Sequence, residues 1–362
     1  MKKTSLTHLH EEAGAHMVEY AGYSMPVEYS GVISEHNAVR NNAGIFDASH
    51  MGEFWVRGKE ALSLLQYVTT NDVSTLDIGK AQYTCMPNGS GGIVDDLIIY
   101  KHASEKYMLV VNASNLQKDW EWLNSHNSFG AELKNVSDDL SLIALQGPKS
   151  LQILQPLVSD KLSDIKSFSF ITAGVGGVSN VIISATGYTG AGGFELYCPN
   201  MDAPKLWQSI VSQGKNLGLQ PAGLAARDTL RLEMGYCLYG NDINDSTSPI
   251  EAGLGWIVKF SEGKKFIDHD LLEKQKTNGV SRKLVGFELL ERGIPRKDYL
   301  LQNMKGQDIG IVTSGTMSPT MQKGIGMGYV LTSEAFEHNE IYVQIRNKLL
   351  KASVVKLPFI KS

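Results

Sequence analysis

The sequence predicts an α+β fold with largely antiparallel sheets, followed by a small all-β unit. Segments with helical spacing and segments with strand alternation are mixed along the first part of the chain without a regular βα rhythm, which is typical of α+β proteins. From about Ser281 the pattern changes to short strands that glycines and polar turns separate. No repeat with a period of about 20–50 residues stands out, so a solenoid is not expected.

The elements of the first part follow from their periods, in chain order. Helical spacing is present in Gly58–Thr70, Ala113–His126 and Ala203–Gly214, and GPKSLQILQPLV opens a further helix. Strand patterns are present in EFWVRG, KYMLVVN, LSLIALQG and NVIISATGY.

The C-terminal part is predicted to be all β. Its strand segments are KLVGFELL, DIGIVTSGT, IGMGYVL, EIYVQIRN and KASVVKLPF. Strands of this kind form either a barrel or a sandwich, and the pattern leaves both open. The charged segment DHDLLEKQKTNGVSR before them predicts a helix that runs into a polar linker, so we expect a domain boundary near residue 280.

Composition excludes several function classes. The chain has 362 residues, a net charge of −4 and a pI near 6.2, which gives no electrostatic basis for nucleic-acid binding. We find no apolar run of about 18 residues, and therefore expect no membrane span. The start MKKTSLTHLHEEAGAH turns polar and acidic after its two lysines, so we expect no signal or transit peptide and a cytoplasmic protein.

Metal, disulfide and nucleotide sites are not expected either. The cysteines Cys85, Cys198 and Cys237 are sparse and widely spaced, and no CxxC or HxxxH pair is present. SEGKKF lacks the glycine spacing and the Ser/Thr of a P-loop, and GYTGAGGFELY does not match GxGxxG. The sequence therefore gives no sign of a metal, flavin or nucleotide cofactor.

The stretch GGIVDDLIIY places two acids inside an apolar strand pattern. Neighbours in a strand face opposite sides, so Asp95 and Asp96 lie on opposite faces. A buried carboxylate is costly unless it is paired or hydrogen-bonded, or its pKa is raised. We expect one Asp to meet the N–H groups of the NGSGG turn and the other to face a cleft or a basic partner. Strand geometry does not choose between them.

Two further segments carry candidate polar groups. In the predicted hairpin GYTGAGGFELY, Tyr188 closes one strand, and Glu195 points away from its apolar neighbours in the next. Glu195 is either a charged residue on a solvated face or a carboxylate that accepts two N–H bonds from a planar heterocycle. In the helix GLAARDTLRLEMG, Arg227 and Arg231 share a face. Taken alone, this helix predicts an exposed surface where Asp228 and Glu233 neutralise the arginines locally. The alternative is that Arg227 contacts an anionic or carbonyl group of a ligand.

Seven segments, taken together, resemble one family. They are FDASHMGEFWVRG, NGSGGIVDDLIIY, ALQGPKS, TGYTGAGGFELY, PAGLAARDTLRLEMGYCLYGNDIND, SPIEAGLGWIVK and GIVTSGTMSPT. In this order they resemble the T-protein family of the glycine cleavage system, the aminomethyltransferases, over essentially the whole chain. As a set these motifs are highly specific, although no single one is.

The resemblance implies a fold and a division into domains. The fold would be a three-domain cloverleaf around a central folate cavity. Residues 1–52 and 139–245 would form a split first α+β domain, 53–138 a second α+β domain, 246–280 a connecting helical segment, and 281–362 a C-terminal β-barrel domain.

The resemblance also implies a reaction. The methylene carbon of an aminomethyl group on the lipoyl arm of the H-protein would pass to tetrahydrofolate, a co-substrate, giving 5,10-methylenetetrahydrofolate, ammonia and the dihydrolipoyl H-protein. The H-protein would be the partner, and the enzyme would be monomeric.

The family pattern assigns roles to matching residues. Asp96 would be the catalytic or positioning carboxylate near folate N5, and Glu195 would bind the pterin edge with Tyr188 close by. Arg227 would contact the folate. Supporting contacts would come from Met51, Tyr83, Asn112 and Trp256. Where some members carry an arginine near the chain end that reaches the folate, this chain ends Lys361-Ser362.

Rival functions remain at this point. A folate-binding relative that acts in iron–sulfur cluster maintenance characteristically carries a KGCYxGQE-like segment, and this chain has YGNDINDSTSPIEAG instead. The folate domains of sarcosine and dimethylglycine dehydrogenases belong to longer chains with a flavin domain. A binding module without catalysis is the third alternative.

Overall fold

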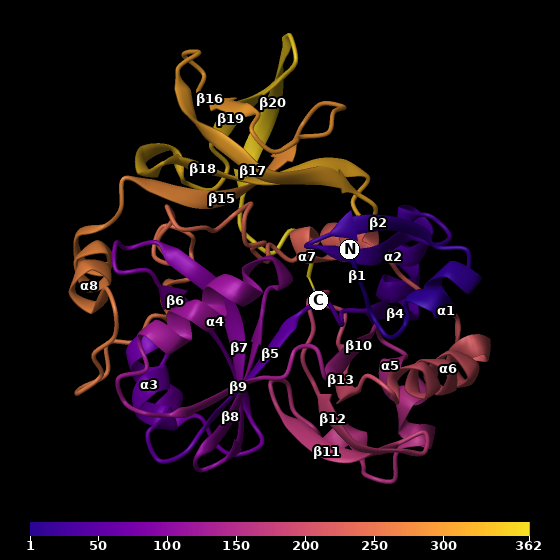
Figure 1. Ribbon diagram of the computed structural model, residues 1–362. Helices are drawn as coiled ribbons and strands as arrows, with labels where there is room; N and C mark the ends of the chain where they lie inside the picture. Colours follow the sequence, from indigo (N-terminus) through magenta and orange to yellow (C-terminus); the bar gives the residue numbers. More distant parts are fainter. Residues whose placement is uncertain (362) are drawn as a thin grey trace. The chain divides into compact units, whose positions relative to one another are not determined.

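The computed structural model describes residues 1–361, and Ser362 lies outside them. The chain divides into two compact units. Unit 1 comprises Met1–Leu65, Val73–Tyr83 and Leu97–Asp228, and unit 2 comprises Gln66–Asp72, Thr84–Asp96 and the chain from Thr229 onward. The α+β class is confirmed, because helices and mainly antiparallel sheets are mixed (Figure 1). The three-domain division is a different partition and stays a prediction.

The helices begin and end close to the predicted limits. Helix α6 has the predicted bounds, and the segments 58–70 and 113–126 contain α3 and α4. The eight α-helices of the described residues are α1 (Thr7–Glu12), α2 (Val32–Asn41), α3 (Ala61–Val68), α4 (Leu116–Ser125), α5 (Ser150–Leu154), α6 (Ala203–Gly214), α7 (Leu224–Glu233) and α8 (His269–Asn278). None of them is long and apolar enough to cross a membrane.

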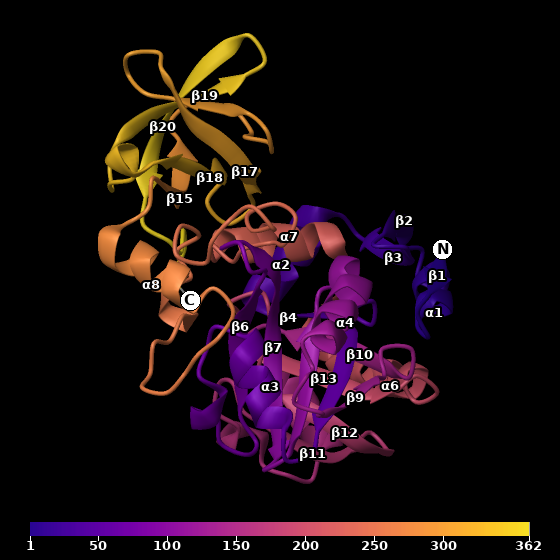
Figure 2. The same ribbon diagram turned by 60° about the vertical axis from the view of Figure 1, so that its left-hand side comes forward.

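Unit 1 contains a small sheet near the N-terminus and a six-stranded sheet. The small sheet, β1-β3-β2, packs beside α1 (Figure 2). Its strands are β1 (Lys2–Lys3), β2 (His16–Tyr20) and β3 (Tyr23–Glu28). The six-stranded sheet has the order β11-β12-β13-β10-β4-β14. Its strands are β4 (Ala43–Asp47), β10 (Leu140–Gln146), β11 (Phe170–Val175), β12 (Val178–Ser184), β13 (Gly193–Pro199) and β14 (Leu219–Pro221).

A five-stranded sheet has the order β6-β7-β8-β5-β9. Its strands are β5 (Gly52–Arg57), β6 (Ala81–Pro87), β7 (Ile93–Ala103), β8 (Lys106–Val111) and β9 (Glu132–Asn135). The unit boundaries fall inside β6, β7 and helix α7, so the chain passes from one unit to the other within regular elements.

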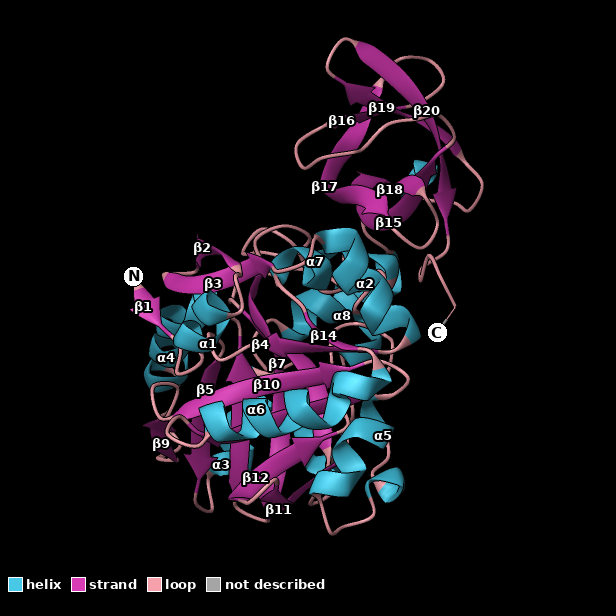
Figure 3. Ribbon diagram, turned by 90° about the vertical axis from the view of Figure 1, so that its right-hand side faces the viewer, coloured by secondary structure: helices cyan, strands magenta, loops and turns pink. Residues whose placement is uncertain are grey.

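Strand alternation in the six-stranded sheet separates two cores of unit 1. On β13, Phe194 and Leu196 belong to the core that α5 and α6 cover (Figure 3). Tyr197, on the opposite face of the same strand, packs with Tyr100 and Met108 of the five-stranded sheet. The two sheets therefore share an apolar layer, and every second residue of β13 points into it.

Unit 2 contains a closed barrel with the strand order β15-β18-β17-β16-β19-β20, which settles the choice between barrel and sandwich. Its strands are β15 (Arg282–Leu289), β16 (Leu300–Gln302), β17 (Asp308–Ser318), β18 (Lys323–Leu331), β19 (Glu340–Ile345) and β20 (Lys348–Val355). All five predicted strands are present. The sequence analysis missed β16, which is too short to show a period. Closure comes from β15, which pairs with both β18 and β20.

The prediction of an exposed ion-pair surface on α7 is wrong for its C-terminal half. Arg231 is buried and pairs with Asp242, which lies outside the helix. Glu233 is also buried and accepts hydrogen bonds from Ser318 and Thr320. The helical period placed Arg227 and Arg231 on one face, but it carried no information on the acid that tertiary packing brings to Arg231.

Candidate active site

Glu195 lies on β13 on the face that points into the layer between the two sheets. The register pairs it with Ser184 of β12 and Ala144 of β10. Its side chain is buried, so the prediction that it points away from Phe194 and Leu196 is confirmed and the solvated-face alternative is wrong. The hydroxyl of Thr186 donates to Glu195 Oε2 over 2.5 Å.

The pKa of the Glu195 carboxyl is raised above its ordinary value. Burial raises the pKa of this carboxyl, whereas the hydrogen bond from Thr186 and the positive charge of Arg227 lower it. An ionised carboxylate can only accept hydrogen bonds, and a site that binds a heterocycle through its N–H groups needs such an acceptor. Glu195 therefore has the position and the surroundings of a ligand-binding acid.

Arg227 and Tyr188 lie together at this part of unit 1. The guanidinium carbon of Arg227 is 4.8 Å from the centroid of the Tyr188 ring, a cation–π arrangement. Tyr188 does not close a strand as predicted: β12 ends at Ser184, and Tyr188 lies in the connection to β13. The positive charge of Arg227 also lowers the pKa of Glu195. Arg227 thus connects Tyr188 and Glu195.

Met51 and Asn112 lie side by side at the ends of two paired strands. Gly52 of β5 is opposite Val111 of β8. Met51 precedes Gly52 and Asn112 follows Val111, so both lie one position beyond this pair. Met51 packs against the layer that contains Tyr100 and is partly buried. Tyr83, on β6, is also partly buried and is the last residue of its segment of unit 1.

His50 is a buried polar residue that the sequence analysis did not single out. Burial and the nearby charge of Arg227 lower the pKa of its imidazole to about 4, so the ring is neutral at physiological pH. No hydrogen-bond partner is present for its Nδ1 among residues 1–361. The segment ASHMGEF, which belongs to the family resemblance, contained this residue, but a single His in an apolar pattern gives no distinguishing signal.

The two acids of GGIVDDLIIY differ in burial. Asp95 is fully buried, and Asp96 is half-buried, in the part of β7 that belongs to unit 2. Burial raises the pKa of the Cys85 and Cys237 thiols, and the charge of Asp96 adds to the rise for both, after that of Asp242 for Cys237. The structure therefore distinguishes the neighbours: the accessible one of the two is Asp96.

The glycine turn before these acids is held by other residues than predicted. Asp268 Oδ2 accepts the N–H groups of Gly89 and Gly91 at 2.8 and 2.9 Å. Asn88 Oδ1 accepts those of Ser90 and Gly92, each at 2.9 Å. The expectation that one of Asp95 and Asp96 meets the N–H groups of this turn is therefore wrong. Asp268, distant in sequence, could not be found from local spacing.

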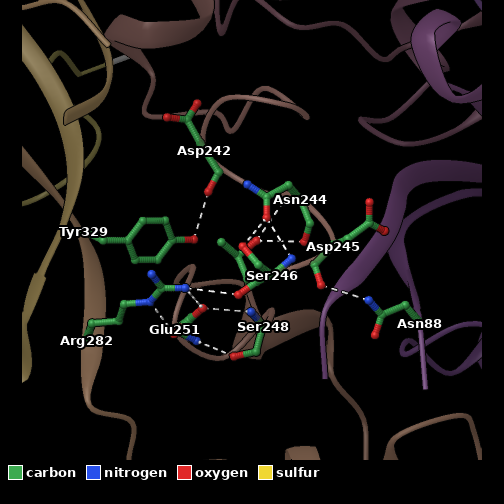
Figure 4. A network of polar contacts seen from close by, with 10 residues as sticks. Asn88, Asp242, Asn244, Asp245, Ser246, Ser248, Glu251, Arg282 and Tyr329 are labelled. Carbon is green, nitrogen blue, oxygen red and sulfur yellow. Dashed lines mark hydrogen bonds and ion pairs between the residues drawn. The ribbon is translucent and has the colours of Figure 1, made fainter. Parts of the chain in front are cut away.

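Trp256 lies in unit 2 with 60% of its surface exposed. It follows a segment, residues 242–251, that polar contacts fix (Figure 4). Arg282 donates to both carboxylate oxygens of Glu251, each at 3.0 Å, and the Tyr329 hydroxyl donates to the carbonyl of Asp242 at 2.8 Å. Ser248 and Glu251 exchange hydrogen bonds as in a capping box. The exposed indole of Trp256 therefore lies a few residues after a segment that these hydrogen bonds order.

One group of side chains in the described chain has the spacing of metal ligands. His269, Asp270 and Glu273 offer atoms within 4.8 Å of one another. Lys265 Nζ lies 3.4 Å from both His269 Nδ1 and Asp270 Oδ1, so an ammonium already neutralises the acid. These side chains form a surface ion-pair cluster, and we assign no metal to it.

Comparison with known proteins identifies the family. The sequence model of the GCVT N-terminal domain matches residues 6–262, and that of the glycine cleavage T-protein C-terminal barrel domain matches residues 282–361. The aminomethyltransferase of Phocaeicola vulgatus is 57% identical over 361 residues, covering 100% of both chains. That of Bacteroides thetaiotaomicron is 58% identical with the same coverage.

A solved structure agrees with these matches. The crystal structure of glycine cleavage system aminomethyltransferase T from Bartonella henselae superimposes with a TM-score of 0.93 and 35% identity, covering 99% of this chain and 98% of that one. The two domain matches, the described fold and the full-length relatives all indicate the same family. The chain therefore belongs to the glycine cleavage T-protein family and is an aminomethyltransferase.

Proposed function

We propose that this enzyme transfers the methylene carbon of the aminomethyl group on the lipoyl arm of the H-protein to tetrahydrofolate. The products are 5,10-methylenetetrahydrofolate, ammonia and the dihydrolipoyl H-protein. The observation that carries the proposal is the similarity to aminomethyltransferases over the whole chain, with both family domains matched.

Glu195 and Arg227 are proposed to bind the folate. The pterin ring presents a row of N–H donors, and a buried carboxylate with spare acceptor capacity suits that edge. Glu195 is such a group, since Thr186 is a hydrogen-bond donor to one of its oxygens. Arg227 contacts the folate in this proposal, and Tyr188, over which its guanidinium lies, provides an aromatic face.

Asp96 is proposed to act on the reacting carbon. The nucleophile is the N5 nitrogen of the folate, so the protein need not supply one. N5 displaces ammonia from the methylene carbon. When the lipoyl thiolate then leaves, the carbon held by N5 acquires an iminium-like positive charge, and N10 closes the ring as its proton passes to the thiolate. A carboxylate stabilises this charge and can relay a proton. The half-buried Asp96 suits this role better than the fully buried Asp95.

Met51, Tyr83, Asn112 and Trp256 are proposed to support folate binding. Side chains of these kinds orient a ligand and exclude water, which is the main work left to the protein when the nucleophile belongs to the substrate. The H-protein would dock as the carrier of the lipoyl arm. We further propose a cytoplasmic, monomeric enzyme.

The iron–sulfur maintenance alternative is not favoured, because the full-length relatives are aminomethyltransferases. The deciding experiment adds aminomethyl-loaded H-protein and tetrahydrofolate to the enzyme and measures ammonia release. We expect release that depends on both substrates. Folded protein that releases no folate-dependent ammonia would contradict the proposal.

A matched arm of this experiment tests the carrier. Free aminomethyl-lipoamide presents the same reacting group without the protein surface of the H-protein. We expect it to react more slowly than the loaded H-protein at the same concentration. Equal rates would remove the docking part of the proposal while leaving the transfer itself intact.

A further inference from the structure

Behind Glu195, three buried hydroxyl groups form a continuous chain. Thr186 Oγ1 is 2.5 Å from Glu195 Oε2, and the hydroxyl of Tyr100 is 3.1 Å from Thr186 Oγ1. The hydroxyl of Tyr197 lies 3.1 Å from that of Tyr100. All four side chains are buried in unit 1. We call Thr186, Tyr100 and Tyr197 the hydroxyl chain.

Three separate elements contribute to the hydroxyl chain. Tyr197 shares a face of β13 with Glu195, Tyr100 comes from β7 of the other sheet, and Thr186 comes from the connection after β12. The rings of Tyr100 and Tyr197 pack edge to face with centroids 5.7 Å apart, which fixes both hydroxyls. The hydroxyl of Ser184 also lies 2.9 Å from Thr186 Oγ1.

The donor order along the chain follows from the charge at its end. A hydroxyl has one proton to donate, and an ionised carboxylate can only accept. If Glu195 is ionised, Thr186 donates to it, Tyr100 donates to Thr186, and Tyr197 donates to Tyr100. Each donation polarises the next hydroxyl, so the whole chain favours the ionised form of Glu195.

Several titratable groups face this chain. Arg227 of α7 adds a positive charge that favours ionised Glu195. Tyr100 and Tyr197 stay protonated, since burial raises the pKa of both phenols. Glu53 of β5 is a further titratable group near Tyr197. Opposing the donors is the burial of Glu195 itself, which favours its neutral form.

We propose that Thr186, Tyr100 and Tyr197 are positioning residues that keep Glu195 ionised and aimed, and thereby set the pH range in which the enzyme binds tetrahydrofolate. This inference rests on the proposed function of Glu195 as the acceptor for the pterin edge. A proton on Glu195 competes with the N–H donors of the pterin. Affinity therefore falls at pH values below the pKa of Glu195 in the free enzyme, and the hydroxyl chain determines where that fall begins.

The test compares Thr186→Val with Thr186→Ser. Valine keeps the shape of threonine and lacks the hydroxyl, whereas serine keeps the hydroxyl. The measurement is the dissociation constant for tetrahydrofolate, by anaerobic calorimetry between about pH 5.5 and 8.5. Thr186→Val loses a hydrogen bond to a charged group and should bind tetrahydrofolate about tenfold more weakly on the acidic side of the profile. The acidic fall in affinity should move up by about one pH unit, and Thr186→Ser should match the parent in both respects.

Two further variants test the chain beyond Thr186. Tyr100→Phe and Tyr197→Phe each remove one hydroxyl and little volume. The upward shift of the affinity profile should be smaller for Tyr100→Phe than for Thr186→Val, and smallest for Tyr197→Phe. Weaker binding at all pH values with no shift in any of the three would mean a packing role only, and would overturn the proposal. Thermal unfolding of each variant establishes that it is folded.

Glu195→Gln separates the two levels of the argument. In this variant the acidic fall in affinity should disappear. If Glu195→Gln kept the affinity and pH profile of the parent, the proposed pterin contact would be wrong. If Glu195→Gln behaved as expected while Thr186→Val matched Thr186→Ser, the pterin contact would stand and the hydroxyl chain would have no role.

Discussion

Arg231 and Asp242 form a buried ion pair in unit 2, with Nη1 2.7 Å from Oδ2 and both side chains almost inaccessible to solvent. The pair is fully hydrogen-bonded. Arg231 Nη2 donates to Ser314 Oγ at 2.8 Å, and Asp242 Oδ1 accepts from Thr313 at 2.5 Å. It joins the last turn of α7 and the segment after it to strand β17 of the barrel.

Breaking this pair should be strongly destabilising. Arg231→Met leaves the carboxylate of Asp242 buried without its cation, which typically costs about 3–5 kcal/mol in the free energy of unfolding. Urea denaturation measures the loss. The control is Arg282→Met, which breaks a part-exposed pair with Glu251 and should cost about 1 kcal/mol. Equal losses in the two variants would show that burial does not determine the effect.

Glu53 should make the enzyme less stable as the pH rises. Its carboxyl group is fully buried, neither oxygen has a hydrogen-bond partner in the described chain, and desolvation raises its pKa well above the usual range. Above about pH 4.3 the unfolded chain loses this proton while the folded chain retains it, so stability falls with rising pH up to the folded pKa.

Glu53→Gln removes this dependence. The gain in unfolding free energy over the parent should grow by about 1.4 kcal/mol per pH unit between about pH 5 and the folded pKa. Denaturation curves at several pH values measure it. The exposed Glu105 provides the control, since Glu105→Gln should give no pH-dependent difference. A constant gain at every pH would show that Glu53 does not retain its proton.

Asp96→Asn and Asp95→Asn should differ in kind. Asp96→Asn removes the charge proposed to stabilise the iminium-like carbon, so turnover should fall by about 100-fold or more while folate affinity changes little. Asp95→Asn alters a fully buried group and should mainly lower the melting temperature. Steady-state ammonia release, folate calorimetry and thermal unfolding separate these effects. Equal loss of activity in two equally well folded variants would refute the assignment of Asp96.

Gly92→Ala should disturb the turn before the two acids. A Cβ atom at Gly92 would lie 1.8 Å from the backbone oxygen of Asp245, and backbone cannot move aside as a flexible side chain does. Strain of this kind costs about 1–3 kcal/mol, which thermal unfolding detects. Gly174→Ala is the control, because the nearest atom to its Cβ would be 3.7 Å away. A Gly92→Ala protein as stable as Gly174→Ala would mean that the turn relaxes freely.

The sequence by itself determined the elements and the directions of their side chains. Period and alternation located α6, the five longer barrel strands and the opposed faces of Asp95 and Asp96, because these depend on backbone geometry over a few residues. The alternation of GFELY also placed Glu195 opposite to its apolar neighbours. The family resemblance, carried by seven short segments, predicted the aminomethyltransferase class that the comparisons show.

Tertiary structure alone decided what each of these side chains meets. The acid that pairs with Arg231, the Asp268 oxygen that holds the glycine turn and the Tyr100 hydroxyl behind Thr186 all come from distant parts of the chain. Such partners are selected by how sheets and loops pack. Local periodicity cannot encode that choice, because a strand pattern specifies the face toward which a side chain points and not the residue that it contacts.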